Sequence, residues 1–282
     1  MRSSFGLLHN AKQVLHWLDD RYQQYIYERP WASYREKVAR EAPWPGFREE
    51  AEQFCRDGVL VLPCHFQGEI LRGMQADVNR WVEKITMDSV GRYVMNENTK
   101  AYLRDSAAFS RAAMDPWILA LVRYYWGKPV FLAHSSGYRL DPSPGGRKIG
   151  PFQWHHDANR KQLKALIYLD DVSREGQRMD YLPGTHRIWH RFGRGPGGYE
   201  ETRIPDEAVV PYGQPVRCAG PAGTVLLFDT NGIHRGNQNQ SAKRDVWVFQ
   251  YTAGRHLLPF SGLHPEVLGR LTADDRRLAR AS

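Results

Sequence analysis

The chain of 282 residues has few cysteines, namely Cys55, Cys64 and Cys218. Three cysteines are too few for a disulfide framework, and they are compatible with a reducing compartment. No uninterrupted apolar run is long enough to cross a membrane, and the first residues do not lead into the apolar core of a signal peptide. These absences predict a soluble, cytoplasmic protein without a membrane-spanning segment.

The sequence also lacks a helix-turn-helix or zinc-finger pattern, and its basic residues are scattered along the chain. Lys and Arg number 39 against 31 Asp and Glu, which gives a net charge of +8. Such a charge is typical of a solvated basic surface, and it also attracts an anionic substrate. We therefore expect a small-molecule substrate, with an anionic one favoured, and no nucleic-acid partner.

The N-terminal half has helical character, and its 41% hydrophobic content allows a large core. The spacing of apolar residues predicts helices at about 11–28, 47–57, 68–85 and 115–126. Gly58 ends the second of these helices, and Asp115 caps the fourth. We expect residues 1–45 to form an N-terminal helical extension and residues 46–282 to form one globular domain.

After Pro129 the character changes to short β-prone runs separated by turn residues, which is typical of a sandwich or barrel. The segment 185–214 is long and rich in Gly and Arg, as binding loops and lids often are. The predicted strands are Val130–Leu140, Phe152–Asp157, Leu163–Asp170, Met179–Leu182, Thr224–Asp229 and Val246–Thr252.

Two stretches, Trp154-His155-His156-Asp157 and Gly232-Ile233-His234-Arg235-Gly236, contain residue types that bind metals. Residues two apart in a strand share a face, so His155 and Asp157 project together and His156 points away. Folding must bring in His234, which lies 79 positions after His155 (234 − 155). Two imidazoles and one carboxylate leave open metal positions, as in non-haem Fe(II) oxygenases. The alternative is ordinary polar residues at strand ends, because His-x-Asp alone is a weak pattern.

Arg244 follows His234 by ten positions (244 − 234). Its guanidinium offers a planar fork that pairs with a carboxylate through two bonds, which lysine does not reproduce. The alternative is a surface arginine that opens a strand and pairs locally with Asp245.

Taken together and in order, these motifs resemble the phytanoyl-CoA dioxygenase family of Fe(II)/2-oxoglutarate oxygenases. The resemblance runs from about Phe47 to Thr252 and implies a mainly β fold with flanking helices. That fold is a double-stranded β-helix, a jelly-roll or cupin-like barrel, with N-terminal helices. The further matching stretches are Phe54–Pro63, Leu182–Arg187, Gly223–Asp229 and Asn239.

The resemblance implies that His155, Asp157 and His234 bind iron, and that Arg244 holds the distal carboxylate of 2-oxoglutarate. With O2 as co-substrate, the implied reaction is hydroxylation of an unactivated C–H bond in a small metabolite or natural-product intermediate. Desaturation, epoxidation and ring formation stay open, since substrate placement decides among them. The intact Asp157 argues against halogenation, because halogenating relatives carry a small residue there.

Five further residues are predicted at the site. Arg139 is expected to contact the cosubstrate or an anionic substrate, and Thr185 is expected to contact the cosubstrate, although Thr185 also suits a turn. Tyr138, Trp154 and Tyr168 are expected to line the substrate pocket, and core packing is the common alternative for such aromatics.

Two positions depart from the family pattern. Relatives often carry a hydroxyl two residues after the distal histidine, where this chain has Gly236, so one cosubstrate contact is lost or replaced. The strand before Pro183 is usually more apolar, whereas here Asp180 lies in it and either faces solvent or contacts a substrate group.

Two rival functions use the same residues. The first is a zinc-dependent enzyme such as a hydrolase, although no general base of the His-Glu-x-x-His kind is present. The second is a non-catalytic binding protein on the same fold, against which the intact ligand set and Arg244 argue.

Overall fold

The computed structural model describes residues 30–88, 91–96, 101–142, 150–157, 161–187, 203–237, 242–253 and 262–278. The helix predicted at 11–28 and the centre of the long loop, residues 188–202, lie outside these ranges. Within them, no helix is long and apolar enough to cross a bilayer.

The described helices concentrate before residue 127 and near the C-terminus. They are α2 (Ala32–Glu41), α3 (Phe47–Asp57), α4 (Gly68–Val82), α5 (Tyr102–Asp105), α6 (Ala107–Ala113), α7 (Pro116–Trp126), α8 (Asp206–Val209), α9 (Pro265–Leu268) and α10 (Ala273–Leu278). Short 3-10 turns occur as η1 (Gly150–Phe152), η2 (Thr185–Arg187) and η4 (Val210–Tyr212).

The strands begin at β1, directly after α3, and then follow mainly after α7. They are β1 (Val59–Leu62), β2 (Arg92–Asn96), β3 (Phe131–Leu140), β4 (Trp154–His155), β5 (Leu163–Tyr168), β6 (Met179–Tyr181), β7 (Arg203–Ile204), β8 (Val216–Cys218), β9 (Val225–Asp229), β10 (His234–Gly236) and β11 (Arg244–Thr252).

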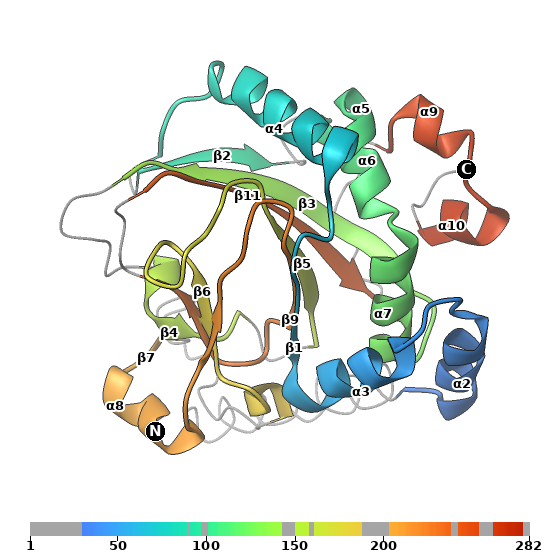
Figure 1. Ribbon diagram of the computed structural model, residues 1–282, viewed down its shortest axis with the longest axis horizontal. Helices are drawn as coiled ribbons and strands as arrows, with labels where there is room; N and C mark the ends of the chain where they lie inside the picture. Colours follow the sequence, from blue (N-terminus) through green and yellow to red (C-terminus); the bar gives the residue numbers. More distant parts are fainter. Residues whose placement is uncertain are drawn as a thin grey trace, which may run out of the picture.

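These strands form two antiparallel sheets. A six-stranded sheet has the order β1-β9-β5-β11-β3-β2, and a five-stranded sheet has the order β7-β4-β10-β6-β8. Strands distant in sequence therefore lie side by side, as expected for a double-stranded β-helix, although the two sheets do not close into a barrel. In Figure 1, α4, α6 and α7 flank the six-stranded sheet, and β4, β6 and β7 lie away from these helices.

Alternate side chains of β11 point to opposite faces of the six-stranded sheet, one packed against the helices and the other lining a cavity. Trp247, Phe249 and Tyr251 are fully buried in the core shared with the helices. The Trp247 ring lies 4.1 Å from that of Phe109 in α6, measured between centroids, and its Nε1 donates to Ser135 Oγ at 2.7 Å. The intervening residues of β11 face the other way, into a cavity between the sheets.

Local signals explain where the main helices begin and end. Gly58 stops α3 in the left-handed region at φ 75°, which a glycine adopts without strain. Asp115 Oδ1 accepts from the Ile118 N–H at 3.0 Å and so caps α7. Both helix boundaries agree with the sequence prediction.

Several elements were not predicted, chiefly β2, α5, α6, β7, β8 and β10. Most are only two to seven residues long. Such short elements contain too few repeats for periodicity to indicate them. Pairing with neighbouring elements stabilises them instead, as with β10, which lies between β4 and β6.

We expect Trp247→Ala to lower the free energy of unfolding by about 3–5 kcal/mol, because it opens a cavity between the helices and the sheet. Urea titration followed by circular dichroism measures this change. Trp31→Ala is the matched control, since Trp31 is 54% exposed, and we expect an effect within about 0.5 kcal/mol. Equal effects of the two substitutions would contradict the packing role of Trp247.

Candidate metal centre

The predicted metal ligands come together where β4 meets β10. His155 ends β4, His234 begins β10, and the two residues are direct partners in the antiparallel register. Asp157 lies two residues beyond β4 and is not part of a strand. Its backbone N–H donates to Thr230 O at 2.9 Å, which ties it to the turn before β10.

The three side chains converge on one point. Asp157 Oδ1 lies 3.4 Å from His155 Nε2 and 3.8 Å from His234 Nε2. The Nδ1 atom of each histidine lies 2.8 Å from a backbone carbonyl, that of Gln153 for His155 and that of Gly232 for His234. Each Nδ1 therefore carries the proton, and each Nε2 presents a lone pair toward the carboxylate.

The protonation states of His234 and Asp157 suit a divalent metal. Burial lowers the pKa of His234 to about 3, and the neighbouring His155 lowers it as well, so this imidazole is neutral at neutral pH. Burial raises the pKa of Asp157, but Lys164 and the two histidines outweigh it and hold that pKa well below its usual value. Neutral imidazole and ionised carboxylate are the forms that bind metal.

The triad opens into a cavity of about 390 Å³ between the two sheets. Arg244 lines the same cavity and is buried. Its Nη1 donates to Gln177 O, whereas its Nε is buried without a hydrogen-bond partner. None of the described carboxylates pairs with this guanidinium, so the cavity offers a buried cation that an anionic ligand would satisfy. The residues present therefore fit both a metal and a dicarboxylate.

Arg139 lies elsewhere. Its guanidinium forms two bonds to Asp245, at 2.7 and 2.6 Å, and a third to Asn79 at 2.5 Å. Neighbouring residues of β11 point to opposite faces, so Asp245 and its partner Arg139 lie on the side away from Arg244. The geometry thus does not bring Arg139 to the cosubstrate position expected from the sequence.

Thr185 is also outside the cavity, in the turn η2. Its hydroxyl donates to Leu182 O at 2.6 Å and accepts from the Ile233 N–H at 2.8 Å. The second bond holds the backbone of Ile233, the residue that precedes His234. Thr185 therefore positions the backbone of a predicted ligand instead of reaching the cavity.

Of the three predicted aromatic residues, Tyr138 alone lines the cavity. Trp154 is buried in a separate apolar cluster, where the Arg235 guanidinium lies 4.2 Å from its ring centroid. Tyr168 is fully buried and donates to Cys218 O at 2.6 Å. Trp154 and Tyr168 therefore take the packing role that was their alternative.

The two departures from the family pattern also have a structural explanation. A Cβ atom on Gly236 would lie 3.0 Å from the Phe152 ring, so that ring occupies the space beside this position. Asp180 is buried beside Arg178 and Arg235, and its Oδ1 lies 2.8 Å from Arg178 Nε. It neither faces solvent nor lines the cavity, contrary to both expectations.

Sequence reasoning missed five polar residues of the cavity wall, namely Arg92, His134, Ser136, Lys164 and Gln250. Lys164 Nζ lies 2.5 Å from Asp157 Oδ2, the oxygen of the carboxylate that the histidines do not approach. The alternation of β5 was an available signal, because Leu163, Ala165 and Ile167 are buried in the helical core, so the intervening residues face the opposite side.

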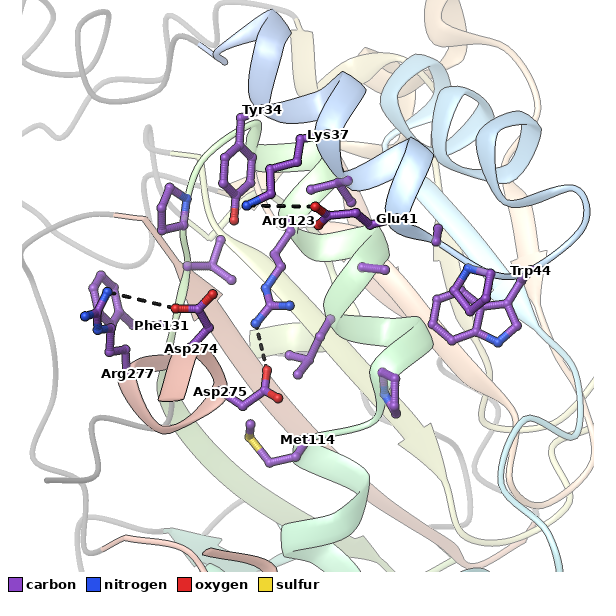
Figure 2. Close-up of a pocket in the computed structure, with 18 residues that line it drawn as sticks. Tyr34, Lys37, Glu41, Trp44, Met114, Arg123, Phe131, Asp274, Asp275 and Arg277 are labelled. Atoms are coloured by element: carbon purple, nitrogen blue, oxygen red, sulfur yellow. Dashed lines mark hydrogen bonds and ion pairs between the residues drawn. The ribbon is translucent and has the colours of Figure 1, made fainter. Parts of the chain in front are cut away.

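A second, larger hollow of about 730 Å³ lies between α2, α7 and α10 (Figure 2). Its charged groups pair with each other, as Arg123 does with Asp275 at 2.9 Å and Lys37 with Glu41 at 3.9 Å. No histidine or cysteine is among the described residues that line it. As the described residues outline it, this hollow therefore lacks the imidazole groups that the smaller cavity offers to a metal.

Comparison with known proteins agrees with this site. The family model for phytanoyl-CoA dioxygenase (PhyH) matches residues 54–246. The ectoine dioxygenase of Stutzerimonas stutzeri (strain A1501) is 26% identical over 250 residues, which cover 77% of this chain and 81% of that protein. The ectoine dioxygenase of Halomonas elongata is also 26% identical, over 75% of this chain and 72% of its own length.

Solved structures show the same fold. EctD from S. alaskensis in its apoform superposes with a TM-score of 0.60 at 21% identity and covers 86% of this chain and 88% of its own. The epimerase SnoN in complex with Fe3+, alpha ketoglutarate and nogalamycin RO superposes with a TM-score of 0.59 at 19% identity, over 78% and 93%. The predicted double-stranded β-helix is confirmed.

A His/Asp/His group inside a double-stranded β-helix, with a buried arginine in the same cavity, defines an Fe(II)/2-oxoglutarate-dependent oxygenase. The family match covers more than half of the sequence. This chain therefore belongs to the phytanoyl-CoA dioxygenase family.

We expect His155→Ala and His234→Ala each to weaken Fe(II) binding more than about 100-fold, since loss even of a group behind a ligand costs about 10–100-fold. Anaerobic Fe(II) titration with measurement of bound metal tests this. His264→Gln is the control, because His264 lies at the start of α9 and is not among the residues that line the cavity. Full iron stoichiometry in both alanine variants would show that the metal binds elsewhere.

Proposed function

We propose that this oxygenase hydroxylates an unactivated C–H bond of a small-molecule metabolite, with iron held by His155, Asp157 and His234. Arg244 holds the distal carboxylate of 2-oxoglutarate. The observation that carries the proposal is the presence, in one cavity, of a preformed metal triad and a buried guanidinium without a carboxylate partner.

The bound iron and 2-oxoglutarate supply the oxidising chemistry, in which O2 is consumed and 2-oxoglutarate becomes succinate and CO2. The two Nε2 atoms and Asp157 Oδ1 would hold the metal, and three protein ligands would leave room for the cosubstrate and O2. Arg244 fixes the orientation of the cosubstrate through its planar fork. Apolar side chains of the wall, including Val246, Val248 and Phe228, exclude water from the reacting groups.

The size of the cavity favours a small substrate. As the described residues outline it, the volume of about 390 Å³ is near the lower end of the roughly 300–1,000 Å³ typical of small-molecule sites. The cosubstrate occupies part of that volume. A compact metabolite therefore fits better than an acyl-CoA thioester. Because the relatives are ectoine dioxygenases, ectoine is the first compound to test.

A zinc-dependent hydrolase on the same triad is the less favoured function. Hydrolysis needs a general base beside the metal-bound water, and Asp157 is the only carboxylate among the described residues of the cavity wall. Such an enzyme would also have no use for the buried Arg244. Succinate formation that depends on both added Fe(II) and 2-oxoglutarate distinguishes the oxygenase from the hydrolase and from a non-catalytic protein.

We expect Arg244→Ala to raise the KM for 2-oxoglutarate by about 10–100-fold, because bonds to a charged group contribute roughly 1.5–3 kcal/mol. Bound Fe(II) should stay nearly unchanged, since Arg244 does not touch the triad. Succinate formation and iron content measure the two effects. Arg244→Lys should recover only part of the loss, because an ammonium group lacks the planar fork.

Arg139→Ala is the matched control for this experiment. It removes an arginine from the neighbouring strand β3, where the guanidinium pairs with Asp245 outside the cavity. We expect the KM for 2-oxoglutarate to stay within about twofold of the wild-type value, since a change of 1.4 kcal/mol is needed for a tenfold effect. Loss of iron in Arg244→Ala with unchanged cosubstrate affinity would contradict the proposed role.

A further inference from the structure

A row of three polar side chains crosses the inner face of the six-stranded sheet beside the triad. In the register of the sheet, Gln250 of β11 pairs with Lys164 of β5 on one side and with His134 of β3 on the other. All three residues line the cavity. In the next row on this face, Val248 pairs with the apolar Leu166 and with Ser136, whose hydroxyl donates to Tyr138 OH at 3.2 Å, so the row of Lys164, Gln250 and His134 is the more polar of the two.

This row lies at the opposite end of β11 from Arg244. Gln250 follows Arg244 by six residues (250 − 244), which corresponds to about 20 Å along a strand. One small dicarboxylate cannot contact both ends. Lys164 Nζ lies 2.5 Å from Asp157 Oδ2, so the polar row adjoins the metal triad. If the cosubstrate extends from the metal toward Arg244, the polar row is left to the substrate.

Two members of the row have unused hydrogen-bonding capacity. His134 Nδ1 is buried without a partner. Among the described residues, no hydrogen bond is formed by the amide of Gln250, which can both donate and accept. Polar groups left unsatisfied on a cavity wall are costly unless a ligand or water meets them, so this row suits recognition of a polar molecule.

The charges of the loaded site favour an anion. The positive charges of Fe(II), Lys164 and Arg244 exceed by one the negative charges of Asp157 and 2-oxoglutarate. Arg92 also lines the cavity, but its guanidinium pairs with Asp88 at 2.9 Å and adds no net charge. Burial, assisted by Lys164, lowers the pKa of His134, so this imidazole adds no charge near neutral pH. A single excess positive charge in a poorly solvated cavity matches one carboxylate better than a phosphate group, which carries about −1.5 to −2.

We propose that Lys164, Gln250 and His134 form the substrate subsite, and that the substrate is a small molecule with one carboxylate. Lys164 pairs with that carboxylate, and Gln250 and His134 form hydrogen bonds with its other polar groups. This inference rests on the proposed function, because it takes the Arg244 end to be occupied by 2-oxoglutarate.

The test uses the full chain loaded with Mn(II), which holds the site without turnover, and with saturating 2-oxoglutarate. The probes are free amino acids, 2-hydroxy acids and cyclic amino acids, each compared with its own primary amide. Calorimetric titration gives the Kd of every probe. We expect at least one acid to bind about tenfold or more tightly than its amide, and to stimulate succinate formation by the iron enzyme.

Substitutions at Lys164 and Gln250, with a control at Lys37, assign the preference for acids to the polar row. Lys164→Met should reduce the acid-to-amide ratio to about one. Gln250→Leu should weaken binding of both members of a pair while leaving their ratio, the Mn(II) content and the KM for 2-oxoglutarate unchanged. Lys37→Met removes the same charge from α2, in the other hollow, and should behave as wild type. Lys164→Gln keeps a donor for Asp157 if the methionine variant loses Mn(II).

Two results would overturn the inference. One is that no acid binds more tightly than its amide, and the other is that the Lys164 variants keep the preference for acids. The proposed function fails separately, through absence of 2-oxoglutarate binding to the Mn(II)-loaded wild type or of succinate from the iron-loaded enzyme. An acid that binds only when 2-oxoglutarate is withheld occupies the cosubstrate position and also counts against the subsite.

Discussion

The site depends above all on the antiparallel pairing of β4 with β10, which sets His155 opposite His234 across 79 positions of sequence. The ring centroids lie 4.3 Å apart, close enough for both Nε2 atoms to approach one carboxylate oxygen. The same local device orients each ring, because each Nδ1 bonds the carbonyl two residues earlier in the chain. The register thus determines the position of the two histidines, and the local bond to a carbonyl orients each ring.

The turn that leads into β10 is held by a buried polar network. Asp229 Oδ2 accepts from Tyr125 OH at 2.5 Å, and Tyr181 OH donates to the Asp229 carbonyl at 3.0 Å. A Cβ atom on Gly232 would lie 1.9 Å from Tyr181 OH, so only glycine permits this approach. Tyr125 of α7 and Tyr181 of β6 therefore both bind the turn that precedes His234. These contacts fix the position of His234 at the start of β10.

The metal residues could be predicted from the sequence because their chemistry is rare in combination, but one step of the reasoning was incomplete. His155 and Asp157 were expected to share a face of one strand, whereas β4 ends at His155. The carboxylate still converges, because the Asp157 N–H bonds Thr230 O. A long-range backbone bond of this kind leaves no signal in the sequence.

The cavity wall was harder to predict because it depends on register. Arg139 and Arg244 are both arginines at strand ends, and only the pairing of Asp245 with Arg139 shows that they point to opposite faces. From the sequence alone, Lys164 is expected to be a solvent-exposed lysine. Its place on the cavity wall follows only from the position of β5 between β9 and β11. Short runs indicate that strands exist, but they do not determine which neighbours those strands take.

A comparison of three buried or partly buried arginines separates structural from functional charge. Arg139 has Asp245, and Arg178 has Asp180 at 2.8 Å, so the chain itself neutralises both. Arg244 has no described carboxylate partner, and burial lowers its pKa. Burying a cation in this way opposes folding unless a partner arrives. A buried charge without a counter-charge from the chain is commonly part of a functional site. At Arg244 the chain supplies no described carboxylate, so the ligand must bring one, whereas Lys164 already pairs with Asp157.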